Sequence, residues 1–228
     1  MTAPLPVVVL VSGRGTNLRA LLGTQAAGWL PVAFRAVVSN RPGAPALDHA
    51  ARRGIRAETV DHTAYPDREH FEAELRARID AHAPGLVVLA GFMRILTHGF
   101  IEHYRDRLIN IHPSLLPDFR GLHTHERALA AGVTRHGATV HFVTPELDGG
   151  PAVLQASVPV HADDDADTLA ARVLEREHRI YPLAVRWFAE GRLRFDGSNA
   201  WLDGRRLDEP LRDPPEIDDV PLTAETAP

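Results

Sequence analysis

Asn110 and His112 are the residues whose types and spacing most directly suggest chemistry. They lie in residues 108–117, LINIHPSLLP, an apolar run that stops at a proline. The residue before a proline favours extended backbone, so His112 is expected in a strand with Asn110 on the same face. An amide donor beside an imidazole could hold a carbonyl oxygen. An isolated N-x-H is more often a strand end whose polar residues cap a turn, so the rest of the chain must decide.

Asp148 opens a glycine-rich stretch, residues 148–150, that would ordinarily form a turn. As a flexible loop with a carboxylate near the sheet edge, the same stretch could instead meet His112. A neighbouring carboxylate favours the imidazolium form of histidine, which would supply a cation near neutral pH.

Residues 12–17, SGRGTN, follow an apolar run and precede a helical pattern. Backbone N–H groups at such a helix start can bind an anion, and glycines let a phosphate approach closely. A tight turn with Thr16 as helix cap explains the pattern about equally well. A dinucleotide fingerprint is disfavoured because Leu18 replaces its third glycine and residues 39–41, SNR, carry no acid. No Walker Gly-Lys-Ser/Thr is present, so a phosphate monoester fits best.

Three further patterns carry less weight. Residues 91–96, GFMRIL, end a predicted strand and could be core or could line a flat hydrophobic ligand slot. His123, His125 and Glu126 lack the helical spacing of a zinc motif, so no metal site is expected. Ser114 lacks the Gly-x-Ser-x-Gly setting of a nucleophile.

The chain has 228 residues, a formal net charge of -5 and no cysteine. That length suits one α/β domain with a substantial core. The charge, without a lysine- or arginine-rich block, argues against nucleic acid or an anionic membrane as partner. Lack of cysteine excludes disulfides and thiolate chemistry. No signal peptide or membrane span is recognised, so a cytoplasmic enzyme or binding protein is expected.

Strands alternating with helices predict an α/β fold with a central, twisted, mostly parallel sheet flanked by helices. Residues 138–144 are expected to form a half-buried strand, and residues 208–228, rich in Pro, Asp and Glu, a disordered acidic tail. A small hairpin is expected near residues 194–202. The other expected strands are 5–11, 34–39, 55–60, 86–90, 108–112 and 153–160, and the expected helices are 16–27, 44–53, 67–83 and 167–190, with a short helix within 121–131.

Six motifs occur in an order that identifies a family resemblance: SGRGTN (12–17), VVLAGFMRIL (87–96), NIHPSLLP (110–117), GLHTH (121–125), LDGGP (147–151) and EHRIYP (177–182). Over residues 5–205 the chain resembles the phosphoribosylglycinamide formyltransferases of purine biosynthesis. The resemblance implies a Rossmann-like formyltransferase fold in a single domain, residues 1–207, with a phosphate-binding N-terminal half and a folate-binding C-terminal half. It implies formyl transfer from 10-formyltetrahydrofolate to the amine of glycinamide ribonucleotide, without a metal, by a monomer or homodimer.

The resemblance also implies roles for individual residues. The implied catalytic residues are Asn110, His112 and Asp148; the substrate phosphate and ribose would be held by Gly15, Thr16, Asn17 and Glu177; the folate would be held by Arg68, Met93, Arg94, Ile95, Leu96 and Asn110. Two positions depart from the family pattern. Thr16 replaces the commoner serine, and Arg120 stands where a proline is expected, in a loop near the site.

Three alternatives remain open at this stage. A formyltetrahydrofolate deformylase would use the same catalytic residues with water as acceptor, and would be expected to carry an additional N-terminal domain. A tRNA formyltransferase would be expected to carry a further C-terminal domain and a basic surface. A non-catalytic phosphoribosyl-binding module would explain residues 12–17 but leaves the grouping of Asn110, His112 and Asp148 without a reason.

Overall fold

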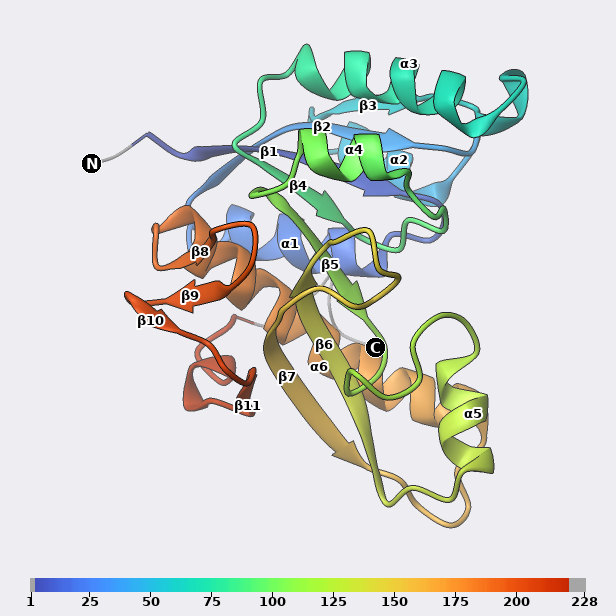
Figure 1. Ribbon diagram of the computed structural model, residues 1–228, viewed down its shortest axis with the longest axis vertical. Coiled ribbons are helices and arrows are strands. Elements are labelled where there is room, and N and C mark those ends of the chain that lie inside the picture. Colours follow the sequence, from blue (N-terminus) through green and yellow to red (C-terminus); the bar gives the residue numbers. More distant parts are fainter. Residues whose placement is uncertain (1–2, 222–228) are drawn as a thin grey trace.

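The computed structural model describes residues 3–221 of the chain. Its main feature is an eight-stranded sheet with the order β11-β7-β6-β5-β4-β1-β2-β3 (Figure 1). Only β6 runs antiparallel to its neighbours β5 and β7, so the predicted mostly parallel α/β sheet is confirmed. The strands are β1 (Leu5–Val11), β2 (Val32–Ser39), β3 (Arg56–Thr59), β4 (Leu86–Leu89), β5 (Leu108–His112), β6 (Arg135–Phe142), β7 (Ala152–Pro159) and β11 (Leu211–Arg212).

Helices cover both faces of this sheet. The helices are α1 (Thr16–Ala26), α2 (Pro45–Ala51), α3 (Arg68–Asp80), α4 (His98–His103), α5 (Thr124–Ala130) and α6 (Ala166–Ala189), with short 3-10 turns η1 (His62–Ala64) and η2 (Pro215–Ile217). Alternate β1 residues point to opposite faces. Val7 and Val9 pack with α1, α2 and α6, whereas Val8 and Leu10 pack with α3 and α4. Burial on both faces explains why this strand is continuously apolar.

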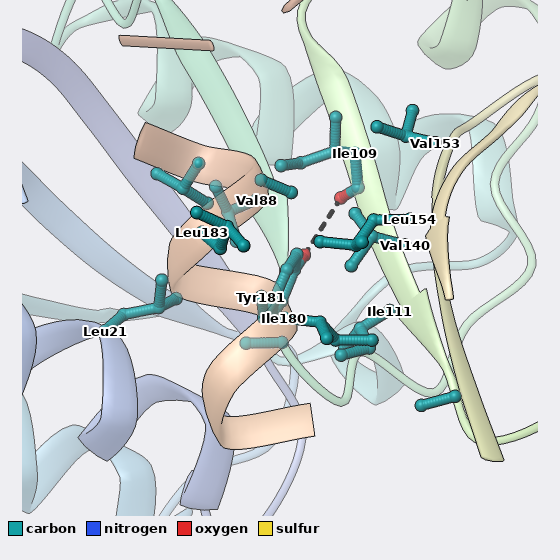
Figure 2. Packing of buried hydrophobic residues seen from close by; sticks show 14 of the residues in the cluster. Leu21, Val88, Ile109, Ile111, Val140, Val153, Leu154, Ile180, Tyr181 and Leu183 are labelled. Carbon is teal, nitrogen blue, oxygen red and sulfur yellow. Dashed lines mark hydrogen bonds between the residues drawn. The ribbon is translucent and has the colours of Figure 1, made fainter. Parts of the chain in front are cut away.

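Tyr181 of α6 links the C-terminal end of β4 to the first half of β5. Its hydroxyl lies deep in the core, 2.7 Å from the Leu89 carbonyl oxygen and 3.2 Å from that of Ile109. Figure 2 shows the contact with Ile109. Burial raises the pKa of this phenol, so it stays protonated and able to donate. The contact holds β4 beside β5 immediately before Asn110.

The expectation that residues 138–144 form a half-buried strand is wrong. All of β6 except Arg135 is buried. Ala138, Val140 and Phe142 pack in the cluster that includes α6. The opposite face is also covered, because Thr139 is hydrogen-bonded to the segment after β5 and His141 contacts Asn110. The polar residues of the alternation therefore face a buried site.

The expected small hairpin is present as β8 (Leu193–Phe195) and β9 (Ala200–Leu202), joined by β10 (Arg205–Arg206) in a three-stranded sheet. The expectation of disorder from residue 208 is wrong for residues 208–221. There β11 adds to the edge of β7, and Ile217 and Val220 are buried in the core cluster that includes α6. Residues 222–228 lie outside the described residues. Within residues 3–221 no helix has the length and apolarity to cross a membrane.

Candidate active site

The candidate site lies where β5 and β6 pair. Asn110 is opposite His141, and His112 is opposite Thr139, so the four side chains share the face of the sheet that α6 does not cover. The period of two predicted from the sequence therefore places Asn110 and His112 side by side. Register with β6 adds two polar neighbours that the sequence did not reveal.

His112 is almost fully buried and has an oxygen acceptor at each ring nitrogen. Its Nε2 lies 3.0 Å from the carbonyl oxygen of Phe119, and its Nδ1 lies 3.5 Å from Oδ2 of Asp148. Neither oxygen can donate a proton when the carboxylate is ionised. Both ring nitrogens therefore face acceptors, and neither faces a donor. The 3.5 Å separation is an ion-pair distance, longer than a direct hydrogen bond.

The segment between β6 and β7 brings Asp148 to this position. Asp148 has a left-handed backbone, with φ of 48°, and its Oδ2 accepts the Gly121 N–H at 2.9 Å. At Gly150 a Cβ would lie 1.9 Å from the Phe142 carbonyl oxygen, so only glycine lets the segment fold back so closely on β6. Arg120, which stands where a proline was expected, forms an ion pair with Glu146. This pair joins the segment after β5 to the segment between β6 and β7, and the two segments meet at Asp148.

His141 is a site residue that the sequence reasoning missed. Burial lowers its pKa to about 4, so the ring is neutral at pH 7. Its Nδ1 lies 2.9 Å from the Phe142 carbonyl oxygen and must carry the proton, which leaves Nε2 as an acceptor. Asn110 Nδ2 donates to this Nε2 at 3.2 Å. His141 therefore fixes the rotation of the Asn110 amide and leaves its second N–H for another acceptor.

A pocket of about 540 Å³ opens directly onto these residues. It is lined by Asn110, His112, Asp148, Leu147, residues 91–95 and residues 121–126. Met93 and Ile95 are among the lining residues and are more than half exposed, which suits a flat apolar ligand. Of the residues expected to bind folate, Met93, Arg94 and Ile95 line this pocket. Leu96 instead packs in the core, and Arg68 is exposed at the start of α3 outside the pocket lining.

The loop after β1 is built as a helix start with free N–H groups. Gly15 is the N-cap of α1, and no side chain caps the helix, so the alternative in which Thr16 caps it does not hold. Gly15 has φ of 77°, and a Cβ there would lie 2.6 Å from that of Ala46. Glycine is thus required both by conformation and by contact with α2. The uncapped N–H groups form the geometry that binds an anion.

Asn17 and Glu177 meet beside this helix start. Asn17 Nδ2 donates to Glu177 Oε2 at 2.6 Å, and both residues are buried. Asn17 Oδ1 has no hydrogen-bond partner within the described part of the chain. Burial raises the pKa of Glu177 to about 7, with the Asn17 bond partly opposing that rise. A buried, unsatisfied acceptor beside a carboxyl that titrates near pH 7 is an arrangement that a ligand with hydroxyl donors would complete.

Ser12 connects the loop after β1 with residues 91–95, which form one wall of the pocket. Its hydroxyl donates to Asn40 Oδ1 at 2.5 Å and accepts the Met93 N–H at 2.8 Å. Glu72 of α3 holds the other end of this wall by accepting from the N–H and the hydroxyl of Thr97. The pocket wall is therefore anchored at both ends by buried polar residues.

His123 and His125 contact different partners. His125 Nδ1 lies 3.2 Å from His136 Nε2, while His123 pairs with Glu126. Among residues 3–221, no group of three or more His, Asp or Glu side chains is placed to hold a metal ion. Burial lowers the pKa of His136 to about 4, so a neutral histidine pair accounts for this contact.

The sequence and the fold both place the chain among formyl transferases. The family model described as Formyl transferase matches residues 5–185. The chain is 52% identical over 201 residues to the phosphoribosylglycinamide formyltransferase of Escherichia coli K12, covering 88% of this chain and 95% of that protein. The protein therefore belongs to the formyl transferase family, and within it to the phosphoribosylglycinamide formyltransferases.

Solved structures separate this branch from a related one. The phosphoribosylglycinamide formyltransferase of Coxiella burnetii superposes with a TM-score of 0.86 at 50% identity, covering 90% of this chain and 96% of that chain. A formyltetrahydrofolate deformylase from Pseudomonas syringae superposes with a TM-score of 0.79 at 28% identity, and the match covers 87% of this chain but 66% of that one. The Rossmann-like formyltransferase fold is confirmed by the first likeness.

Proposed function

We propose that this protein transfers the formyl group of 10-formyltetrahydrofolate to the amine of 5′-phosphoribosylglycinamide. The products are the formylated ribonucleotide and tetrahydrofolate, as expected for a step of purine biosynthesis. The observation that carries the proposal is the grouping of Asn110, His112 and Asp148 at one end of an apolar pocket, with an anion-binding helix start at the end of β1.

In the proposed reaction the substrate amine attacks the formyl carbon, which forms a C–N bond and places negative charge on the formyl oxygen. The Asn110 N–H that His141 leaves free and the cationic His112 ring stabilise this oxyanion. Asp148 maintains the charge of His112 and helps to relay, through water, the proton that leaves the amine. The oxyanion then collapses and the bond from carbon to N10 breaks, while N10 takes up the proton relayed from the amine, which releases tetrahydrofolate.

For the ribonucleotide, the N–H groups of Gly15, Thr16 and Asn17 would bind the phosphate. Ribose hydroxyls would donate to Asn17 Oδ1 and to Glu177, which supplies partners for the unsatisfied acceptor described above. Ionised Glu177 accepts such bonds better than the protonated acid does. This pairing of a phosphate site with a sugar site gives the acceptor substrate its own place in the fold.

For the formyl donor, Met93, Arg94 and Ile95 would contact the pterin in the pocket, together with Asn110. Leu96 would support this wall from the core. The role of Arg68 at the folate glutamate tail stays a prediction, as does cytoplasmic placement. Monomer and homodimer are both compatible with the proposal, and no metal takes part in it.

The main alternative is a deformylase, in which water accepts the formyl group. The anion-binding helix start and the Asn17–Glu177 pair favour the transferase, because hydrolysis of the folate needs neither. The test follows folate product release from 10-formyltetrahydrofolate by absorbance, with and without glycinamide ribonucleotide. Release that requires the ribonucleotide is expected. Equal release without it would establish a deformylase, and binding of both compounds without release would indicate a non-catalytic module.

A further inference from the structure

A row of polar side chains crosses the sheet from His112 towards the C-terminal segment. Thr139 of β6 is opposite His112, Gln155 of β7 is opposite Thr139, and Arg212 of β11 is opposite Gln155. Thr139 and Gln155 are almost completely buried. Buried polar side chains are unfavourable unless they are hydrogen-bonded, so the bonds that they form show what they support.

The hydroxyl of Thr139 and the amide nitrogen of Gln155 use all of their hydrogen-bonding capacity. Gln155 Nε2 donates to the Leu116 carbonyl at 2.8 Å and to Thr139 Oγ1 at 3.0 Å. Thr139 Oγ1 also accepts the Leu116 N–H at 3.0 Å and donates to the Ser114 carbonyl at 2.7 Å. An amide nitrogen has two hydrogens, and a hydroxyl has one hydrogen and two acceptor sites. The network therefore has a single arrangement of its hydrogens.

These bonds all end on the segment that leads away from His112. Within residues 113–119, Ser114 Oγ extends the network by donating to the Asp118 carbonyl at 2.6 Å. The next residue is Phe119, whose carbonyl oxygen accepts from His112 Nε2 at 3.0 Å. Displacement of residues 113–119 would therefore move the acceptor that orients the imidazole.

We propose that Gln155 is a positioning residue for His112, acting through Thr139 and residues 113–119 without touching either substrate. The proposal rests on the catalytic role of His112 given under the proposed function. A purely structural role would only satisfy the backbone groups of a buried segment. The two roles differ in their effect on turnover, because a misplacement of about 1 Å at a reacting group can lower the rate about 100-fold.

The first variant is Gln155→Met, which removes both N–H donors and keeps the length of the side chain. The expected result is a kcat lowered about 10- to 100-fold, with KM for both substrates within about threefold of the wild type. The matched control is Val158→Ala, which removes buried volume from the same strand without touching residues 113–119. A kcat for Gln155→Met no lower than that of Val158→Ala would overturn the proposal.

A second pair covers the case in which Gln155→Met does not fold. Thr139→Val removes the hydroxyl at nearly constant volume, whereas Thr139→Ser retains it. Restored kcat in Thr139→Ser beside a low kcat in Thr139→Val is expected. Equal kcat in the two variants would overturn the proposal, because the bond to residues 113–119 would then not matter for turnover.

A third readout does not depend on catalysis. In protein labelled with ¹⁵N-histidine, the Nε2–H signal of His112 is assigned as the one absent from His112→Asn. Its exchange with solvent is expected to quicken in Gln155→Met and in Thr139→Val, but not in Val158→Ala. Unchanged exchange in both would contradict the positioning role. If the wild type transfers no formyl group, the proposed function fails while this measurement still decides whether Gln155 orients His112.

Discussion

Asn17 and Glu177 form a hydrogen bond of 2.6 Å between Nδ2 and Oε2, although 160 positions of sequence separate them. The bond joins the start of α1 to the middle of α6, at the place assigned to the ribose. Glu177 is surrounded by protein, and burial raises its pKa to about 7. Its charge therefore changes close to neutral pH.

The first prediction concerns the pH dependence of stability. Unfolded Glu177 would have a pKa near the ordinary 4.5, so between that value and about 7 only the folded state retains the proton. The contribution of Glu177 to the free energy of unfolding must therefore fall as the pH rises between these two values, by on the order of 3 kcal/mol. Glu177→Gln has no such proton. The difference in unfolding free energy between variant and wild type, measured in urea, should shift in favour of the variant from pH 5 to pH 8.

The difference in unfolding free energy between Glu177→Gln and the wild type cancels the contributions of the other titrating groups. Burial lowers the pKa of His136 and of His141 to about 4, and both contribute in the same way to wild type and variant. A difference that stays constant from pH 5 to pH 8 would contradict the assignment of Glu177 as a buried acid with a pKa of about 7.

The second prediction concerns the carboxylate beside His112. Asp148→Asn keeps an oxygen for the Gly121 N–H but removes the charge that supports the imidazolium. Steady-state kinetics should show a kcat lowered about 100-fold or more. Glu146→Gln is the matched control, because it removes an exposed negative charge from the same segment while keeping an oxygen acceptor for Arg120, and should leave kcat within about twofold. Similar losses in both variants would point to a general effect of loop charge.

The third prediction concerns the proposed oxyanion donors. Asn110→Ala and His112→Ala should each lower kcat about 100- to 1000-fold, because each removes one group that stabilises charge in the transition state. Binding of both substrates, measured by calorimetry, should change little. His98→Ala, at an exposed position in α4, provides a histidine control. Near-normal turnover of His112→Ala would reject its catalytic assignment.

The fourth prediction concerns the C-terminal segment. Ile217 is buried against the core cluster that includes α6, so Ile217→Ala should lower the free energy of unfolding by about 2–5 kcal/mol. The exposed Asp219 serves for comparison, and Asp219→Ala should change it by less than about 0.5 kcal/mol. Equal stability of the two variants in chemical denaturation would mean that the segment is not docked.

Much of the fold could be predicted because the central strands are buried on both faces. Continuous apolar runs at β1, β4 and β5 mark such strands, and glycines mark the ends of neighbouring helices. The short helix α4 was missed, since six residues containing Gly99 show no helical periodicity. The C-terminal segment was judged by composition, but two apolar residues and a short β-ladder suffice to dock it.

For the site, local geometry was predictable and tertiary register was not. Asn110 and His112 follow from the period of two in one strand, whereas Asp148 required the guess that a loop folds back. His141 and Gln155 belong to antiparallel pairs whose register depends on the segments between the strands. The alternation of His141 with apolar residues suggested an exposed face, and only the covering segment after β5 makes that face interior.

The most direct test of the central claim follows the formyl carbon. Enzyme, glycinamide ribonucleotide and 10-formyltetrahydrofolate carrying a ¹⁴C-formyl group are mixed with excess unlabelled formate. Direct attack of the amine at the site of Asn110, His112 and Asp148 predicts that the ribonucleotide product carries the label at the full specific activity of the donor. Recovery of the label as free formate, or its dilution in the product, would contradict direct transfer.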